Sequence, residues 1–334
     1  MTAPTTAGTP GLFRLSADGR DITHLVASRL LELALTDERQ GRTDQLDIEL
    51  DNSDDRLELP TPDTVLALSL ADRHGRLVDM GEYVLDTCEL DIDSGVITLV
   101  ARSADIAKSL RVRREISYHD TTVAAMVQQI ADRNDLSSVI DARFMTLAVD
   151  HFDQTGESDL SVLDRLGELY NAMAVVKAGR VLFVPLGSAQ TLSGQPLPAI
   201  ELVFQRCSSS RLRLEKTQYT GVITYWNETQ GAERQPVLVG SDVYPRKIRG
   251  TYRSESQARA AASAKWAMLQ RAQRQFNTTL QYPNPDAQPQ CRLTFSPGWP
   301  SAVADSALMI RRVTHRLSGS AGASVDIEAE AVIE

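Results

Sequence analysis

The chain has few cysteines, few aromatic residues and no long apolar run. Its three cysteines, Cys88, Cys207 and Cys291, are odd in number and far apart, which matches neither a disulfide framework nor a zinc pattern. The opening MTAPTTAGTPG lacks the apolar core of a secretory signal. No apolar run approaches the roughly 18 residues of a membrane-spanning helix. We therefore expect reduced thiols, no cleaved export signal and no integral membrane segment.

Recognisable catalytic signatures are also missing. The sequence contains no glycine-rich phosphate loop, no Gly-x-Ser-x-Gly elbow and no His-Glu-x-x-His motif. The pairs His119-Asp120 and His151-x-Asp153 are close combinations of histidine and aspartate. His151 and Asp153 point the same way in an extended segment, but two side chains are too few for a metal or acid–base site. We expect no enzyme, no cofactor and no metal.

The segment from His151 to Asn171 is a polar extended run that turns into an amphipathic helix. Ser158 or Asp159 is placed to cap that helix, because a short side-chain oxygen accepts from the unpaired amides of the first turn. Glu157 and Asp159 resemble the carboxylate pair of glycoside hydrolases. Aromatic residues make up only 5% of the chain, too few to suggest a sugar groove. A scaffold helix is the better interpretation.

The charge balance argues against stable binding of nucleic acid. With 44 acidic and 35 basic residues the net charge is −9, whereas non-specific nucleic-acid binding depends on lysines and arginines that neutralise phosphates. At 42% hydrophobic residues, the chain can still bury cores in two or three domains.

The order of periodic patterns predicts a mainly β protein with an α+β insert. Leu46, Ile48 and Leu50 alternate with acidic residues, which is typical of half-buried strands, and many short strands with turns favour a sandwich or barrel. Helical periodicity appears at 121–134 and 158–170, and Ser254 with Gln257 forms a capping box for a long helix. The predicted divisions are a flexible arm at 1–20, a β domain at 21–112, the insert at 113–187, and, after a linker at 187–198, a β domain with one long helix at 188–334.

At this point the sequence resembles the phage late control D family, the baseplate hubs of contractile tails and R-type pyocins. It is also similar to the hub half of type VI secretion spike proteins. The matching text runs from about residue 20 to the end. It includes DQLDIELD at 44–51, HDTT at 119–122, DQT at 153–155, ESD at 157–159, YTGV at 219–222 and AKW at 264–266. One departure is the short segment 228–235, where some members carry a lysine-rich insertion. The residues expected to carry the family scaffold are Asp153, Gln154, Glu157, Ser158, Asp159, Tyr219, Gly221, Trp226 and Trp266.

The resemblance implies a homotrimer in which each subunit holds two tube-type β-barrels flanking the small helical insert. Six barrels would form a pseudo-sixfold ring that adapts the hexameric tail tube to the trimeric central spike. The implied partners are other copies of the chain, the spike, the tail tube, the tape-measure protein and other baseplate proteins. The implied location is a phage tail or headless tailocin particle, assembled in the host cytoplasm.

Acidic strand faces recur in both β regions, and we hypothesise that they line the central channel. The carboxylates concerned are Asp47, Glu49, Asp326, Glu328 and Glu330. An acidic wall would repel DNA phosphates during passage, although an exterior solvated face explains the same pattern.

Two other functions remain open. The segment from His119 to Leu136 resembles peptidoglycan-binding LysM text, which suggests a cell-wall-binding tail protein. A transcriptional regulator is suggested only by the name of the family, and the acidic charge argues against it.

Overall fold

The computed structural model describes residues 11–39, 44–103, 108–177, 179–187, 195–227 and 233–333. Residues 1–10 of the predicted arm and most of the predicted linker lie outside these ranges. The chain divides into two compact units. Unit 1 comprises the described parts of Met1–Asp105, Pro198–Leu212 and Phe276–Ala329; unit 2 comprises those of Ile106–Leu197, Arg213–Gln275 and Glu330–Glu334.

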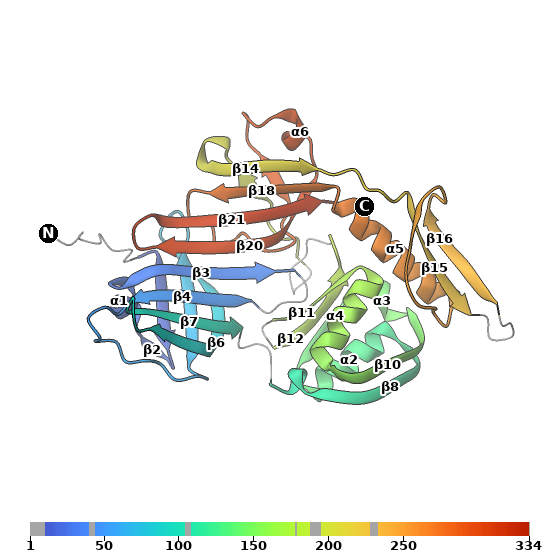
Figure 1. Cartoon of the computed structure of the whole chain (residues 1–334), viewed down its shortest axis with the longest axis horizontal. Helices are drawn as coiled ribbons and strands as arrows, with labels where there is room; N and C mark the ends of the chain where they lie inside the picture. Colours follow the sequence, from blue (N-terminus) through green and yellow to red (C-terminus); the bar gives the residue numbers. More distant parts are fainter. Residues whose placement is uncertain are drawn as a thin grey trace. The chain divides into compact units, whose positions relative to one another are not determined.

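Unit 1 is built around one 11-stranded sheet (Figure 1). In order across the sheet the strands are β14 (Cys207–Leu214), β18 (Arg274–Leu280), β21 (Gly322–Ala331), β20 (Leu308–Ser318), β3 (Leu30–Glu38), β4 (Gln45–Asp51), β7 (Val96–Ser103), β6 (Leu77–Asp91), β5 (Val65–Ala71), β1 (Phe13–Ala17) and β2 (Arg20–Asp21). The antiparallel pairing of β20 with β3 joins the two predicted β regions. Strands of both predicted β regions therefore belong to one sheet.

The expected alternation of the strands is confirmed. Leu46, Ile48 and Leu50 are buried and join one core cluster with side chains of β1, β3, β5, β6 and β7. The arm prediction is wrong for residues 13–20, because β1 pairs with β5 and buries Phe13 and Leu15. Two apolar residues spaced by two positions are the strand signal in this segment.

Smaller elements complete unit 1. They are helix α1 (Thr23–Ala27), helix α6 (Ser301–Ala304), the 3-10 turn Phe204–Arg206, and a parallel pair of strands, β13 (Ile200–Leu202) and β19 (Leu293–Phe295). An aromatic cluster fills the core at this end, where Trp299 contacts Phe204, Phe276 and Phe295 at ring-centroid distances of 5.1 to 5.7 Å. The Trp299 indole N–H donates to the Leu202 carbonyl at 2.9 Å, so the buried polar end of the ring is satisfied.

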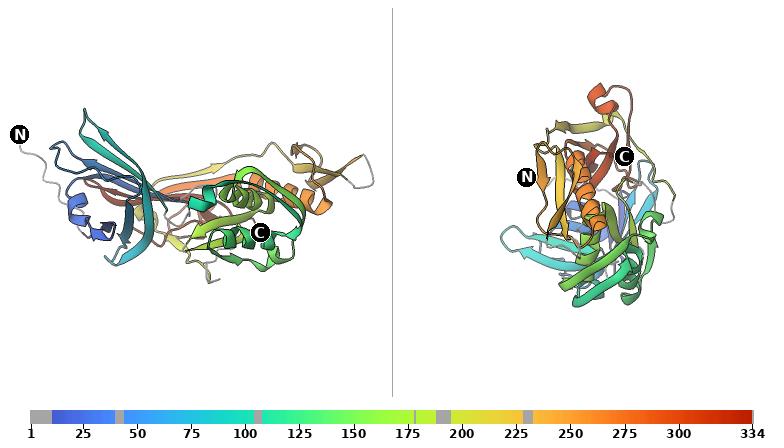
Figure 2. Two further views of the ribbon diagram at one scale, coloured as in Figure 1. Left: turned by 90° about the horizontal axis from the view of Figure 1, so that it is seen from below. Right: turned by 90° about the vertical axis from the view of Figure 1, so that its right-hand side faces the viewer.

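Unit 2 holds the predicted insert and the long helix. Its elements are a 3-10 turn (Lys108–Arg111), β8 (Arg113–Thr122), α2 (Val123–Arg133), β9 (Ser137–Ile140), α3 (Ala142–Met145), β10 (Ala148–Ser158), α4 (Asp159–Tyr170), β11 (Ala172–Lys177), β12 (Arg180–Pro185), β15 (Gly221–Asn227), β16 (Arg234–Gly240), β17 (Pro245–Lys247) and α5 (Glu255–Arg271). They form the pair β10–β8 and the three-stranded sheets β11-β12-β9 and β16-β15-β17. Figure 2 shows α5 lying along β15 and β16.

The helices predicted from the sequence start after short polar side chains, as expected. Ser158 caps α4, and Ser254 caps α5 by accepting from the Gln257 amide. The cap of α2 is Thr122, one residue beyond the predicted Asp120 or Thr121. Asp120 has a φ of 44°, outside the extended range typical of N-cap residues.

The long helix was predicted within the second β domain, and this is corrected by the contacts of α5. It packs on β15, β16 and α4, and small residues such as Ala258 and Ala262 lie fully buried on its inner face. The Thr224 hydroxyl of β15 donates to the Ala258 carbonyl at 3.0 Å. Because these contacts lie in unit 2, the helix belongs with the insert.

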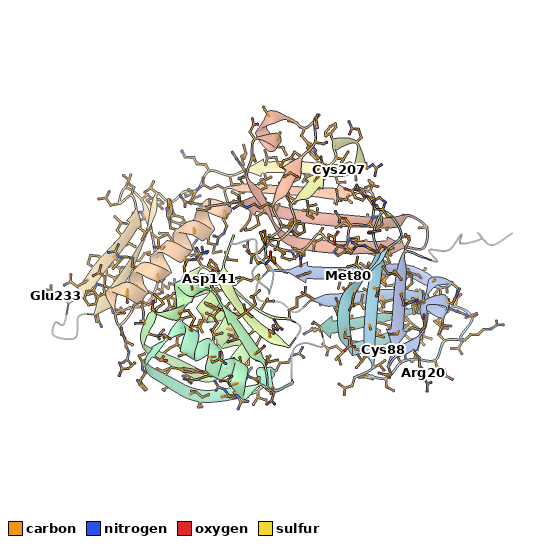
Figure 3. All side chains as sticks on the ribbon, turned by 180° about the vertical axis from the view of Figure 1, so that it is seen from behind. Arg20, Met80, Cys88, Asp141, Cys207 and Glu233 are labelled. Carbon is orange, nitrogen blue, oxygen red and sulfur yellow. The ribbon has the colours of Figure 1, made fainter. Side chains whose placement is uncertain are left out.

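The three cysteines are free thiols, and Figure 3 shows Cys88 and Cys207 on different parts of unit 1. Burial raises the pKa of Cys291 to about 11, and it raises the pKa of Cys88 and Cys207 above their ordinary value. The thiolate is the reactive form, so none of the three thiols is activated.

Candidate functional site

The acidic residues predicted in two separate β regions lie on one face of the unit 1 sheet. Asp47 on β4 is opposite Ala34 on β3, and Ala34 is opposite Arg316 on β20. Arg316 in turn forms an ion pair with Asp326 on β21 at 2.8 Å. Side chains two apart on a strand share a face, so Glu49 and Glu328 belong to the same surface. We call this surface, from β21 across β20 and β3 to β4, the polar sheet face.

Arginines of β20 neutralise much of the carboxylate charge at one end of the polar sheet face. Arg316 bridges Glu32 at 2.5 Å and Asp326 at 2.8 Å. Asp326 also accepts from the Thr279 hydroxyl at 2.7 Å. Hydrogen bonding to Asp326 raises the pKa of Arg316 above its ordinary value. Arg312 and Arg316 were not among the predicted residues, although their spacing on the polar side of β20 is the signal that could have revealed them.

Glu328 is held by two arginines. The Arg312 Nε donates to it at 2.8 Å, and Arg311 links it at 2.5 Å and reaches Glu38 at 3.4 Å. Burial acts to raise the pKa of Glu328, but the hydrogen bonds and charges of Arg312 and Arg311 outweigh burial and lower it. The β20–β21 end of the polar sheet face is therefore a lattice of mixed charge rather than an acidic wall.

The β4 end differs, because Asp47 accepts from the Gln45 amide and Glu49 is exposed. Glu330 departs from the predicted set in another way. Its side chain is buried and pairs with Arg271 of α5 at 3.0 Å. Within the chain, Glu330 is thus not part of the exposed polar sheet face.

A second polar cluster surrounds Asp159 in unit 2. The Asp159 carboxylate is fully buried and accepts hydrogen bonds at 2.9 Å from both Asn134 and Gln154. Arg114 and Arg133 place their Nε atoms 3.4 and 3.6 Å from its Oδ2 atom. One carboxylate thereby joins β8, the end of α2, β10 and the start of α4. We call these five residues the Asp159 cluster.

The scaffold residues around Asp159 take separate roles. Ser158 is the cap of α4, accepting from the Ser161 amide at 3.2 Å, so the alternative that Asp159 caps is wrong. Glu157 forms an ion pair with Arg165 at 3.1 Å. Asp159 is committed to the interior of the cluster, which leaves Glu157 and Asp159 unable to act as the glycosidase-like carboxylate pair.

The later scaffold residues meet around β15 and α5. Tyr219 stacks on Tyr244 with ring centroids 5.7 Å apart, and Trp226 lies on β15. Trp266 of α5 contacts the position where a Cβ of Gly240 would stand, at 3.4 Å. Gly240 is the strand partner of Gly221. The structure thus brings Tyr219, Gly221, Trp226 and Trp266 into one subdomain, separate from the Asp159 cluster.

Gly221 is required by close backbone approach. A Cβ at this position would lie 2.4 Å from the Ser241 carbonyl oxygen and 2.7 Å from that of Val239. We expect Gly221→Ala to destabilise the β15–β16–β17 sheet by about 2 kcal/mol, because backbone must move to admit the methyl group. Hydrogen exchange of the β15 and β16 amides measures the loss. Ser263→Ala on the exposed side of α5 is the control, and equal exchange in both variants would contradict the steric argument.

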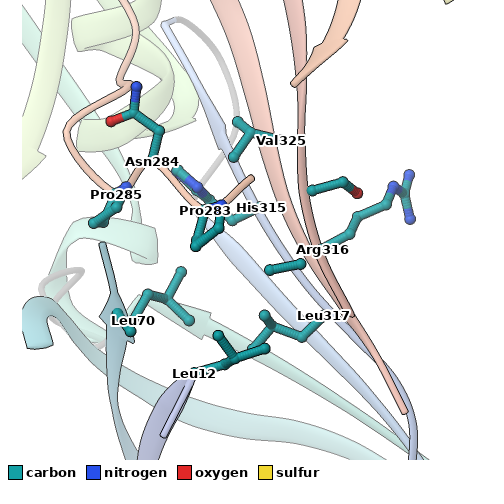
Figure 4. A pocket seen from close by; sticks show the side chains of 12 residues that line it. Leu12, Leu70, Pro283, Asn284, Pro285, His315, Arg316, Leu317 and Val325 are labelled. Carbon is teal, nitrogen blue, oxygen red and sulfur yellow. The ribbon is translucent and has the colours of Figure 1, made fainter. Parts of the chain in front are cut away.

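One buried histidine was missed in the sequence. His315 lies on the core side of β20, beside a small pocket of unit 1 lined by Leu70, Pro283 and Leu317 (Figure 4). Burial lowers the pKa of His315 to about 4, against the opposing effects of Asp37 and the Ala287 backbone. The alternation of Val313, His315 and Leu317 is the signal that places this ring inside.

In the described residues, no group of three or more His, Cys, Asp or Glu is placed to hold a metal ion. None of the described helices combines the length and apolar character needed to span a bilayer. The prominent polar features are the polar sheet face of unit 1 and the buried Asp159 cluster, which ties together β8, α2, β10 and α4.

Comparison with curated proteins gives two relatives across almost the whole chain. The chain is 32% identical to a probable baseplate hub protein of Escherichia phage 186, over 95% of the chain and 92% of the relative. It is 30% identical to the probable baseplate hub protein of Escherichia phage P2, with the same coverage. No family model matches the chain.

Solved structures share the fold at low sequence identity. The 43 kDa tail protein of prophage MuSo2 from Shewanella oneidensis has a TM-score of 0.68 at 11% identity, covering 95% of this chain and 97% of that one. An E. coli component of the type VI secretion system has a TM-score of 0.56 at 13% identity, covering 96% and 77%.

Proposed function

The chain belongs to the family of phage baseplate hub proteins, and from this we propose that it forms the trimeric ring joining the hexameric tail tube to the trimeric central spike of a contractile injection system. The role is structural and involves no turnover. Partners follow from it: two further copies of the chain, the spike, the tail tube, the tape-measure protein and other baseplate proteins. Assembly takes place in the host cytoplasm, and the product is a phage tail or tailocin particle.

The observation that carries the proposal is the continuous sheet of unit 1. It contains two runs of four neighbouring strands, β14-β18-β21-β20 and β3-β4-β7-β6, joined by the β20–β3 pair. We propose that each run serves as one tube-like segment. Three subunits then present six segments, which fits the sixfold tube on one side while keeping the threefold symmetry of the spike on the other.

We further propose that the polar sheet face looks into the central channel. Its support is the register that puts Asp47, Glu49, Asp326 and Glu328 on one surface. Arginine pairing at the β20–β21 end limits the repulsion of DNA phosphates to the β4 end, where Glu49 is exposed and lies opposite Glu32. The paired arginines give the β20–β21 end a rigid wall.

Mass measurement tests the ring. Analytical ultracentrifugation should show three copies of the 36.7 kDa subunit in each particle, whether the protein is alone or bound to its candidate spike. A chain that stays monomeric with spike in excess would contradict the hub role. A structure of the trimer then locates Asp47 and Glu328, and finding them on the outer wall would remove the channel hypothesis while leaving the ring intact.

Peptidoglycan binding is the alternative, and the β8–β10 pair bears on it. Sugar rings are commonly held against open aromatic faces, but Tyr118 is buried and Phe152 is covered by the Arg165 guanidinium at 3.9 Å. These contacts favour the structural role. Retention of the full chain on purified peptidoglycan would favour the alternative.

A further inference from the structure

The paired strands β8 and β10 bring together four polar side chains that the hub role does not use. His119 is opposite His151, and Ser117 is opposite Asp153. The Nδ1 atoms of the two histidines are 3.0 Å apart, and the His151 Nε2 is 2.6 Å from the Asp153 carboxylate. The Ser117 hydroxyl donates to the other oxygen of Asp153 at 2.7 Å. The predicted shared direction of His151 and Asp153 is confirmed, and a second histidine is added to it.

Hydrogen bonding fixes the orientation and tautomer of His151. Hydrogen bonds from Ser117 and His151 lower the pKa of Asp153, so its carboxylate is ionised and can only accept. The proton of a neutral His151 ring is therefore on Nε2, which leaves its Nδ1 as an acceptor on the side of the ring where the Nδ1 of His119 lies. A carboxylate that accepts from the distal nitrogen of a histidine is the arrangement that usually supports metal-binding histidines.

His151 and Asp153 alone are too few for a metal site, but His119 supplies a second nitrogen ligand, and we propose, against the expectation of no metal, that His119 and His151 bind a divalent transition-metal ion through their Nδ1 atoms. Bonds of roughly 2.0–2.1 Å to two nitrogens at a right angle require a nitrogen separation of roughly 2.9 Å. The observed separation is 3.0 Å, which fits adjacent positions of the tetragonal geometry that Cu²⁺ and Ni²⁺ adopt. On binding, the proton between the two Nδ1 atoms moves to the Nε2 of His119, so both rings stay neutral. Water fills the remaining positions.

The site is open to solvent and built on rigid strands. His119 and Asp153 are exposed, and His151 retains 13% of its side-chain exposure, so an ion can enter without unfolding. The ligands come from both strands, and a bound ion therefore fastens β8 to β10 beside the Asp159 cluster. This inference does not depend on the hub role.

Calorimetric titration of the full chain with CuCl₂ or NiCl₂ tests the proposal. We expect one saturable site per subunit, and the electron paramagnetic resonance spectrum of bound Cu²⁺ should show splitting from two nitrogens. His119→Asn or His151→Asn should abolish the site. Asp153→Asn should weaken it about ten- to hundredfold, because the supporting carboxylate is lost while both ligands remain.

The control is His74→Asn, which changes an exposed histidine in a turn of unit 1 and should leave the titration unchanged. Circular dichroism of the metal-free variants checks that they fold. Saturable binding that survives both His119→Asn and His151→Asn would overturn the proposal, as would the absence of binding to the folded wild-type chain. If the folded wild-type chain binds no metal, His119 and His151 only form a hydrogen bond with each other.

Discussion

Replacement of Asp159 by alanine is expected to lower the free energy of unfolding of unit 2 by about 3 kcal/mol. The carboxylate is fully buried and accepts from Asn134 and Gln154, with Arg114 and Arg133 beside it. Its removal takes one of two acceptors from each buried amide, because Asn134 and Gln154 keep only a backbone carbonyl, and it leaves two guanidinium groups without this counter-charge. Urea unfolding followed by tryptophan fluorescence measures the loss, because Trp226 and Trp266 lie in unit 2.

Two variants on the same segment make that result specific. Ser158→Ala removes only the helix cap and should cost about 1 kcal/mol. Glu168→Ala changes an exposed position of α4 and should be nearly neutral. Asp159→Asn keeps the size of the side chain, and we expect an intermediate loss because the arginines stay uncompensated. If Asp159→Ala costs no more than Ser158→Ala, the cluster adds nothing beyond helix capping.

Acid is expected to weaken unit 1 through His315 before most carboxylates protonate. The folded pKa is about 4, against an ordinary value of 6.5. The unfolded chain therefore binds more protons between these limits, and the stability of the fold falls as pH drops through that window. The loss should reach about 3 kcal/mol at pH 4. Urea unfolding of wild type at pH 7, 6, 5 and 4, followed through Trp299, measures it.

His315→Leu is the matched variant, because it replaces the titratable ring with an apolar side chain in the core beside Leu35 and Val313. Its stability should stay nearly flat between pH 6.5 and 4.5. Below that, the carboxylates with lowered pKa, such as Asp51 and Asp72, lose their stabilising hydrogen bonds in both proteins. Parallel pH profiles for wild type and His315→Leu above pH 4.5 would show that another group is responsible.

Much of the secondary structure was predictable because its causes are local. Alternation at Leu46, Ile48 and Leu50 needs only neighbours on the same strand, and the caps Ser158 and Ser254 act within one turn. Cap positions still shifted at α2, where Thr122 accepts from the Ala125 amide. Several residues near a helix start can cap, and only the backbone geometry selects among them.

The remaining features depend on partners distant in the sequence. Pairing of β3 with β20 could not be predicted from either strand, since both carry the same alternating pattern. Without that pairing, nothing in the sequence places Asp47 and Glu49 on the same surface as Arg316, whereas Arg312 and Arg316 are only 16 and 10 positions from Glu328 and Asp326. The sequence suggested Asp159 as a helix cap for the same reason, because Arg114 and Asn134 are distant in sequence and contact it only in the folded chain.

The pairing of β3 with β20 also determines when the sheet can be completed during synthesis of the chain. The Thr36 and Thr314 hydroxyls that meet across it are 278 positions apart. Translation proceeds at ~5–20 residues per second, so β20 is synthesised roughly 14 to 56 seconds after β3. Until then its edge is unpaired and prone to recruit another chain. The sheet of unit 1 is therefore complete only after the last hairpin, β20–β21, has been made.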